Sequence, residues 1–295
     1  MTVLDWPGER AHPAGLRAPF VQSLSNICLD LHGDPQAAKL VVFSDGNHHM
    51  ALEPALQAFL ADHPDVIDIF YATTPPRVVV EALHEGGITM GNLTVTARPH
   101  VFISPPRVLD ALVQRGLMKA HLPLAGSRGN TLIVRKGNPR GIHGIADLMR
   151  EDVKVFLSNP LTETVSYATY AATLRAMAQR LGLTADFLDA KPHPRVVHGE
   201  SIHHREAPQA VADGRADAAV VFYHLALRYT RIFPGIFELM PLTPEGENDP
   251  GQERSRVHIG LVGDGGAWGA RLLEFMTGKR VAAIYRHHGL VPVED

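Results

Sequence analysis

The chain has one cysteine, no long apolar run and little excess of either charge. Because Cys28 is the only cysteine of the 295 residues, an internal disulfide is excluded. No apolar stretch approaches the roughly 20 residues that a membrane-spanning helix needs. The 28 Lys and Arg residues nearly balance the 31 Asp and Glu residues, for a formal net charge of −3. Since a nucleic-acid surface needs a clustered basic face, we expect no nucleic-acid partner.

The N-terminal stretch lacks the apolar core of a signal peptide. We therefore expect either a cytoplasmic protein or a chain given without its export signal. Residues 1–37 are rich in Pro, Gly and Asn/Asp turn residues. They predict an irregular lead-in with a short helix near 18–31.

From residue 38 onward, apolar strand patterns alternate with helical patterns. AKLVVFS (38–44) predicts a strand, and the residues up to 64 predict an amphipathic helix. This alternation predicts an α/β fold with mainly parallel sheets. Further strands are predicted at 66–72, 100–104, 131–139, 153–160, within 207–227, at 237–242 and from 256.

Several segments, in this order along the chain, resemble those of a known family. They are the strand, polar turn and helix at 40–62, then HVFISPPRVLDALVQRGLM, NTLIVRKGNPRGIHGIADL, VADGRADAAVVFYHLAL and the ending LLEFMTGKRVAAIYRHHGLVPV. Over residues 38–293 the chain resembles the two-lobed periplasmic solute-binding proteins of type II. The likeness is to the molybdate/tungstate-binding branch in particular.

The resemblance implies two Rossmann-like α/β lobes with a ligand cleft and a hinge. Lobe one would hold residues 38–130 plus 241–295, and lobe two would hold residues 131–240. The implied function is capture of a small anion, such as molybdate or tungstate, in the interlobe cleft for the membrane permease of an ABC transporter. The resemblance also implies a periplasmic or extracytoplasmic location. We expect a monomer, because binding in such a cleft needs no oligomer.

Four strand-to-helix junctions carry the candidate ligand-binding side chains. In open α/β lobes, ligands lie at the carboxyl ends of strands, beside helix N-termini. Backbone N–H groups and neutral hydroxyls at these positions suit an oxyanion, although the same residue types also cap helices. The candidates are Ser44, Asp45, Asn47, His48, Thr73, Thr74, Thr162, Glu163, Thr164, Phe222 and Tyr223.

Two junctions depart from the molybdate-binding branch. That branch has small uncharged residues at the first junction, where this chain has Asp45, His48 and His49. At the fourth junction the ligand-contacting tyrosine of the branch matches Phe222, which has no hydroxyl. Tyr223 is adjacent and is expected to point to the other face of the strand. The departures leave the identity of the ligand open.

The 17 histidines keep a transition metal open as the ligand. Neutral imidazoles and carboxylates suit zinc, copper, nickel or iron. His48 or His49 would then meet His224, His203 or Glu163, with Asp45 completing the set. A third alternative holds an anion on protonated histidines, with affinity falling as the pH rises past about 6.5. No cofactor is expected to be required beyond a bound oxyanion or divalent transition metal.

The sequence carries no motif of an enzyme class with a recognisable fingerprint. It has no Gly-x-Ser-x-Gly, no phosphate-binding P-loop and no dinucleotide-binding glycine motif. We therefore expect a binding protein rather than an enzyme. A cytoplasmic ligand sensor that works without a transporter is the remaining alternative.

Overall fold

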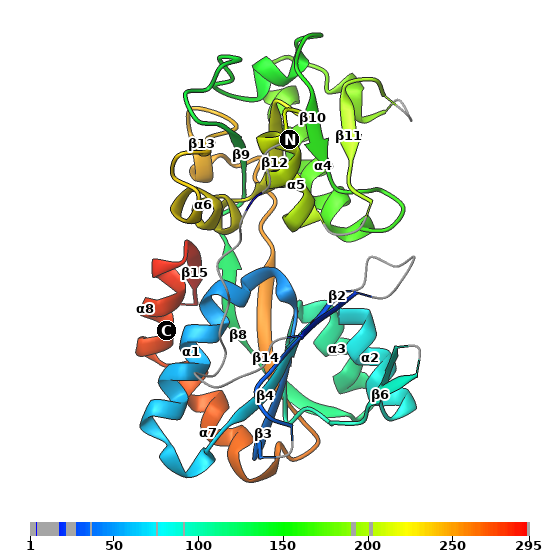
Figure 1. Cartoon of the computed structure of the whole chain (residues 1–295), viewed down its shortest axis with the longest axis vertical. Coiled ribbons are helices and arrows are strands. Elements are labelled where there is room, and N and C mark those ends of the chain that lie inside the picture. Colours follow the sequence, from blue (N-terminus) through cyan, green and yellow to red (C-terminus); the bar gives the residue numbers. More distant parts are fainter. Residues whose placement is uncertain are drawn as a thin grey trace. The chain divides into compact units, whose positions relative to one another are not determined.

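The computed structural model describes Leu4 and residues 18–21, 28–35, 37–74, 76–90, 92–189, 193–200 and 203–293. The chain divides into two compact lobes (Figure 1). The first lobe comprises residues 8–126 and 255–295, and the second comprises residues 1–7 and 127–254. Each lobe has its own mixed sheet with helices against it, so the predicted α/β class is confirmed. The prediction of mainly parallel sheets is wrong, because antiparallel strand pairs flank the parallel strands in both sheets. Among the described residues, no helix is both long enough and apolar enough to cross a membrane.

The first lobe is built on an eight-stranded sheet whose central strands β4, β3 and β7 are parallel neighbours. In spatial order its strands are β1 (Ala18–Val21), β2 (Cys28–His32), β4 (Ile69–Thr73), β3 (Leu40–Ser44), β7 (Val101–Ser104), β14 (Arg256–Val262), β8 (Met118–Ser127) and β15 (Leu290–Pro292). Its helices are α1 (His49–Asp62), α2 (Pro76–Glu85), α3 (Pro106–Gln114), α7 (Gly266–Met276) and α8 (Lys279–His287). A separate hairpin joins β5 (Ile88–Met90) to β6 (Leu93–Val95), and short 3-10 turns are η1 (Gly46–His48) and η2 (Pro64–Val66).

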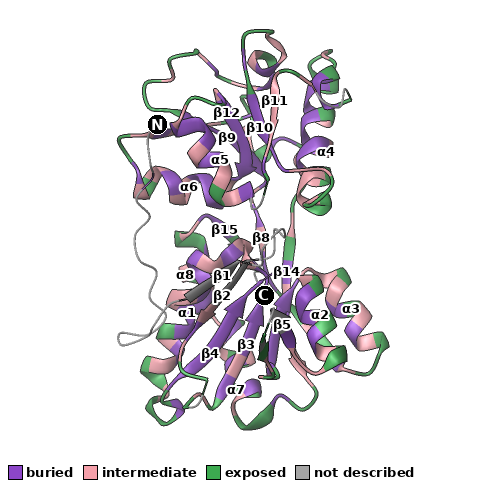
Figure 2. Ribbon diagram, turned by 45° about the vertical axis from the view of Figure 1, so that its right-hand side comes forward, coloured by how far each residue is buried: buried purple, intermediate pink, exposed green. Residues whose placement is uncertain are grey.

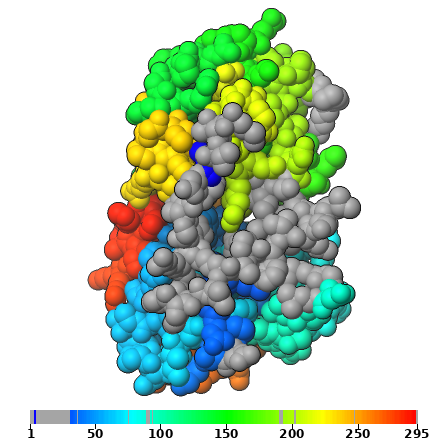
Figure 3. All heavy atoms as spheres, viewed as in Figure 1, coloured from blue at the N-terminus to red at the C-terminus, as the bar shows by residue number. Residues whose placement is uncertain are grey.

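The central strands β3 and β4 of this sheet are largely buried (Figure 2), and their side chains enter a different core on each face. On one face Val42, Tyr71 and Ile103 pack with residues of α1, α7 and α8. On the other face Phe43, Ala72 and Phe102 pack with residues of α2 and α3. Side chains alternate between the two faces along a strand. The core to which a strand residue belongs therefore shows on which face the residues at the end of that strand lie. In the space-filling view, α1 and α8 adjoin at the surface of this lobe (Figure 3).

The second lobe is built on a five-stranded sheet in which β10 is parallel to both of its neighbours. In spatial order its strands are β11 (Val196–His198), β10 (Val155–Leu157), β12 (Ala218–Phe222), β9 (Asn130–Arg135) and β13 (Phe237–Met240). Its helices are α4 (Thr164–Arg180), α5 (His203–Ala212) and α6 (Tyr223–Ile232), with short 3-10 turns η3 (Ile145–Met149), η4 (Asp186–Leu188) and η5 (Gly246–Asn248).

The expectation of an irregular lead-in with a short helix near 18–31 is wrong where the chain is described. Residues 18–21 and 28–32 form the antiparallel pair β1 and β2, and β2 continues onto β4. Pro19 lies in β1, which is an edge strand of the sheet, the kind of strand in which proline is tolerated. The remaining residues of 1–27 other than Leu4 lie outside the described residues.

The predicted boundary near residue 241 also differs from the structure, because residues 241–254 belong to the second lobe. Asp249 explains this placement. Its buried carboxylate accepts hydrogen bonds from Thr243 Oγ1 (2.7 Å) and the Gly251 N–H (2.7 Å), and it pairs with Arg180 of α4. The sequence of this segment indicated only a polar loop, so the contacts made by Asp249 could not be predicted from it.

A second anchor joins the same segment to the start of β9. The Asn130 N–H donates to Gln252 Oε1 (2.6 Å), and Gln252 Nε2 donates to the Asn130 carbonyl (2.8 Å). Gly129 precedes this pair at φ +105°, and an added Cβ would lie 2.3 Å from Gln252 Oε1. Both the conformation and the close approach therefore require glycine at this position.

The Asp249 anchor predicts a large cost for the change Asp249→Asn. Burial raises the pKa of this carboxyl, but the hydrogen bonds from Thr243 and Gly251 and the Arg180 charge outweigh it and lower the pKa overall. We expect Asp249→Asn to reduce the free energy of unfolding by about 1.5–3 kcal/mol at neutral pH. This loss should shrink as the pH falls through the lowered pKa, since the stabilising ionised form is then protonated. Denaturant titrations at several pH values measure both effects.

The matched control is Asp189→Asn. Asp189 forms an ion pair (2.9 Å) with Arg175, which lies in α4 as Arg180 does, but both side chains are at least half exposed. This change should cost less than about 0.5 kcal/mol. Equal losses from the two variants would show that Asp249 does not anchor the segment.

Candidate functional site

The first lobe brings three polar residues into one row across the carboxyl ends of β4, β3 and β7. Ser44 pairs with Thr73 on one side and Ile103 on the other. The ladder continues, because the Thr74 N–H donates to the Ser44 carbonyl and the Asp45 N–H donates to the Ile103 carbonyl, both at 2.9 Å. One residue further along, this register places Asp45 between Thr74 and Ser104, with neighbouring strands about 4.8 Å apart.

The three members of this polar row, Thr74, Asp45 and Ser104, share one face of the sheet. They follow Ala72, Phe43 and Phe102 by two residues, and those side chains lie in the core with α2 and α3. The three strands end next to the helix starts at Pro76, at Gly46 of η1 and at Pro106. The row therefore has the position at which open parallel sheets bind ligands.

Two hydroxyls in the polar row are buried and have no partner among the residues that the structure describes. Thr74 is 2% exposed and Ser104 is fully buried, and no described residue forms a hydrogen bond with Thr74 Oγ1 or Ser104 Oγ. A buried hydroxyl without a partner costs roughly 1–3 kcal/mol, so such atoms point to a function. Thr74 was among the candidates predicted from the sequence, and Ser104 was not. The signal was available, because Ser104 ends the predicted strand at 100–104 and precedes a Pro-Pro helix start.

Ser44 faces the opposite side of the sheet, where its hydroxyl is occupied. Ser44 Oγ lies 2.9 Å from His48 Nε2, and His48 Nδ1 lies 2.9 Å from the Tyr285 hydroxyl. The Ser44 hydroxyl also donates to the Asp45 carbonyl (3.1 Å). One tautomer satisfies this whole chain, in which Tyr285 donates to His48 Nδ1 and His48 Nε2–H donates to Ser44. In that arrangement His48 does not act as a base toward Ser44, as a serine nucleophile would require.

Thr73 is the register partner of Ser44 and lies on the same face. Ser44, His48 and Tyr285 are all nearly fully buried, and burial moves the pKa of Tyr285 far above its ordinary value. The structure therefore separates the predicted first junction into two sets. Ser44 and His48 fix the turn to α8, and Asp45 joins the polar row.

Asp45 is a buried carboxyl in the middle of the polar row. Burial raises its pKa above the ordinary value, and hydrogen bonds from Asn47 partly oppose the shift. Its Oδ1 accepts from the Asn47 N–H at 3.0 Å, which makes Asp45 the N-cap of η1. Asn47 itself is half-buried and also places its side-chain amide 3.5 Å from Asp45 Oδ2.

The histidines proposed as metal ligands do not form a ligand set within the part of the chain that the structure describes. His48 is engaged with Ser44 and Tyr285, whereas His49 Nδ1 lies 2.8 Å from the Gly46 carbonyl. His224 belongs to the second lobe, where its ring stacks on Phe222 with centroids 5.6 Å apart. No group of three or more His, Cys, Asp or Glu side chains with metal-binding geometry occurs among the described residues.

In the second lobe, Glu163 caps a helix. Both of its carboxylate oxygens accept from the N–H of His203, the first residue of α5, at 3.1 and 3.2 Å. Burial raises the pKa of Glu163 to about 7, with a smaller contribution from the charge of Glu206. Thr162 and Thr164 are exposed beside it, and Thr164 Oγ1 lies 3.4 Å from the Pro160 carbonyl. The ligand role of these three residues stays a prediction.

The predicted orientation of Tyr223 on a strand is wrong. β12 ends at Phe222, and Tyr223 is the first residue of α6. The Tyr223 N–H donates to the Gly129 carbonyl (3.0 Å), and the Arg128 guanidinium lies 5.3 Å from the centre of its ring. Phe222 is buried against Tyr170, with ring centroids 5.1 Å apart. The residues up to Leu227 are mostly apolar, so the change from strand to helix could not be recognised in the sequence.

Ser158 is a second strand-end residue that was not among the predicted candidates. It follows β10 directly, is fully buried, and its Oγ has no hydrogen-bond partner within the described residues. His198 Nδ1 lies 3.0 Å from the Ser158 carbonyl. The second lobe therefore repeats, at one strand end, the unpartnered hydroxyl found twice in the first lobe.

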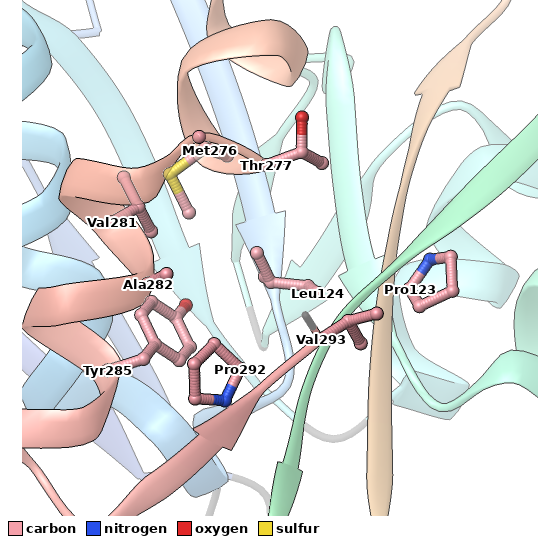
Figure 4. A pocket seen from close by; sticks show the side chains of 10 residues that line it. Pro123, Leu124, Met276, Thr277, Val281, Ala282, Tyr285, Pro292 and Val293 are labelled. Carbon is pink, nitrogen blue, oxygen red and sulfur yellow. The ribbon is translucent and has the colours of Figure 1, made fainter. Parts of the chain in front are cut away.

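A small cavity lies elsewhere in the first lobe, beside Tyr285 (Figure 4). Its volume of about 20 Å³ has room for little more than one water molecule. Ligand pockets are typically about 300–1,000 Å³. The cavity is lined by Pro123, Leu124, Met276, Thr277, Gly278, Val281, Ala282, Tyr285, Pro292 and Val293. It carries none of the predicted site residues.

The raised pKa of Glu163 predicts how stability depends on pH. The folded pKa of about 7 lies above the ordinary 4.5, so the folded chain holds a proton that the unfolded chain releases. The stabilising contribution is complete below about pH 4.5 and is lost as the pH rises through 7. Relative to the native chain, Glu163→Gln should gain stability from pH 5 to 8, with a slope of at most about 1.4 kcal/mol per pH unit. Melting curves across this range measure it.

The control for this experiment is Glu151→Gln, a change at an exposed glutamate of the same lobe. Its stability should run parallel to that of the native chain across the pH range. Parallel curves for Glu163→Gln as well would contradict a half-buried Glu163 with a raised pKa.

Known structures share this fold at low sequence identity. The periplasmic molybdate-binding protein of Azotobacter vinelandii aligns over 87% of this chain and 100% of its own, with a TM-score of 0.60 and 18% identity. The sulfate-binding protein SubI of Mycobacterium tuberculosis aligns over 86% of this chain and 87% of its own, with a TM-score of 0.62 and 16% identity. Iron-bound HitA of Pseudomonas aeruginosa aligns over 87% and 86%, with a TM-score of 0.59 and 11% identity.

These three proteins bind different solutes, so the shared fold does not determine the ligand. No curated protein sequence matches the chain. The family model of the bacterial extracellular solute-binding proteins matches residues 40–291, which is most of the chain. The two-lobed α/β fold and the family model agree with the resemblance noted in the sequence. The chain therefore belongs to the bacterial extracellular solute-binding protein family.

Proposed function

We propose that this solute-binding protein captures a small tetrahedral oxyanion, of the class that includes molybdate, tungstate, sulfate and phosphate, and passes it to the permease of an ABC transporter. The supporting observation is the pair of buried hydroxyls, Thr74 Oγ1 and Ser104 Oγ, which have no hydrogen-bond partner in the described part of the chain. Both belong to the polar row at the carboxyl ends of adjacent parallel strands. Neutral O–H donors beside helix starts stabilise an anion by hydrogen bonding and by the helix dipole.

The described histidines favour the oxyanion over a transition metal. A bound zinc or copper ion needs three or four ligands in a fixed geometry. His48 and His49 have other partners in the structure, and no three-ligand group exists among the described residues. Binding in the polar row needs no bond-making step, so the proposed role is capture without catalysis and without a required cofactor.

Removing the Ser104 hydroxyl tests this role directly. In the free protein, Ser104→Ala removes a buried unpartnered group, so the free energy of unfolding should stay the same or rise by up to about 1–3 kcal/mol. The same change should weaken oxyanion binding by about 10- to 100-fold, the value of one hydrogen bond to a charged group. Thermal melts without ligand, and titration calorimetry with the tightest-binding oxyanion, measure the two quantities.

The matched control is Ser44→Ala at the end of the neighbouring strand. Its hydroxyl has protein partners, so its removal leaves His48 Nε2–H without an acceptor and should destabilise the free protein by about 1–3 kcal/mol. The proposal fails if Ser104→Ala destabilises the protein as Ser44→Ala does and leaves binding unchanged. It also fails if no oxyanion at millimolar concentration raises the melting temperature of the native chain, since a specific ligand stabilises by mass action.

A further inference from the structure

Asp45 places a hydrogen-bond acceptor at the centre of a row that otherwise offers donors. The register puts its Cα between those of Thr74 and Ser104 on adjacent strands. The side chains of all three share the face of Phe43, Ala72 and Phe102. An ion bound by the two hydroxyls must therefore approach the buried Asp45 carboxylate.

An oxyanion without protons is a poor partner for this carboxylate. Each of its oxygens carries negative charge and lone pairs, so it has nothing to donate to Asp45. The contact would place two acceptors of like charge together in a buried site, where water does not screen them. An oxyanion that retains a proton donates its O–H to Asp45 while its other oxygens accept from Thr74 and Ser104.

The neighbouring strand β14 adds a second hydrogen-bond acceptor, His258, beside Ser104 of the polar row. His258 of β14 pairs with Ser104 in the antiparallel register. His258 Nδ1 lies 2.9 Å from His121 Nδ1, and His121 Nε2 lies 3.0 Å from the Asp110 carboxylate. Asp110 only accepts, so in the tautomer that satisfies both contacts His121 donates from Nε2 to Asp110 and accepts at Nδ1 from His258. That tautomer leaves His258 Nε2 as an acceptor.

Resting on the proposed function, we infer that Asp45 makes the polar row select an oxyanion that keeps a proton at neutral pH, such as phosphate or arsenate, over fully ionised sulfate or molybdate. A buried acceptor left without a donor penalises the wrong ligand more than any single contact rewards the right one. The selectivity comes from this chain's departure at the first junction. It separates the ligand from those of structural neighbours that bind molybdate or sulfate.

The test is the change Asp45→Asn, which keeps the cap and removes the charge. Asparagine caps as well as aspartate, so the contact from the Asn47 N–H is preserved. The new amide group donates, and it suits a fully ionised oxyanion. Titration calorimetry at neutral pH with phosphate, arsenate, sulfate and molybdate, each as the sodium salt, compares the native chain with Asp45→Asn.

We expect the native chain to bind phosphate or arsenate at least about tenfold more tightly than sulfate and molybdate. In Asp45→Asn this ratio should fall at least about tenfold, through weaker phosphate binding and stronger sulfate or molybdate binding. The matched control is Asp264→Asn in the same lobe. Asp264 makes the same type of contact, accepting from the N–H two residues ahead at Gly266 (2.9 Å), and this change should leave every affinity unaltered.

Two results would overturn the inference while the proposed function stands. One is native binding of sulfate or molybdate as tight as that of phosphate and arsenate, and the other is an unchanged ratio in Asp45→Asn. If none of the four anions binds, or if only Ca²⁺ or Mg²⁺ added alone binds, both the inference and the proposed function fail.

Discussion

The parallel register of β4, β3 and β7 is the constraint on which the candidate site depends. Parallel strands end at a common edge, and their hydrogen-bond ladder fixes which residues become neighbours there. The backbone bonds from Thr74 to Ser44 and from Asp45 to Ile103 carry this ladder one residue past the strands. A slip of one residue would exchange the two faces and move the polar row into the core beside α1 and α8.

Within that register, each of two neighbouring residues takes a different role. Ser44 faces α1 and α8, and its hydroxyl is held through His48 by Tyr285 from the last helix of the lobe. Asp45 faces the other way and caps η1. Hydrogen bonds therefore hold the turn after β3 on one face of the sheet, and the Asp45 carboxylate lies on the other face. A carboxyl buried in this way keeps its position without a cation beside it, at the expense of a raised pKa.

The sequence was sufficient for the fold class, and it was insufficient for the identity of the contacts at the candidate site. Apolar runs such as residues 38–44 and 100–104 predicted the central strands, because buried parallel strands are nearly continuous in apolar residues. Thr74 and Asp45 were found by the rule that ligands lie at strand ends. Ser104 was missed because the end of its strand was not counted among the four strand-to-helix junctions, although the same rule applies there.

Other features were hidden because they depend on contacts distant in sequence. Tyr285 lies 237 residues from His48, and Gln252 lies 122 residues from Asn130. Periodicity reports only which face of an element is apolar, so the partner of a buried polar group is not encoded locally. The start of α6 at Tyr223 was hidden for a different reason. The apolar run from Ala218 to Leu227 has no Gly, Pro or capping residue to mark the change from strand to helix.

Asp45 and Asp249 show how the partners of a buried carboxylate indicate its purpose. Asp249 accepts from a hydroxyl and a backbone N–H and pairs with Arg180, so its charge is compensated and its pKa is lowered. The Asp45 carboxylate accepts hydrogen bonds from Asn47, and its pKa is raised. The first arrangement stabilises the ionised form within the protein. The second leaves acceptor capacity at a strand end, next to two hydroxyls that have no partner among the described residues. A ligand with both an O–H donor and negatively charged oxygens satisfies all three groups at once, which a fully ionised oxyanion does not.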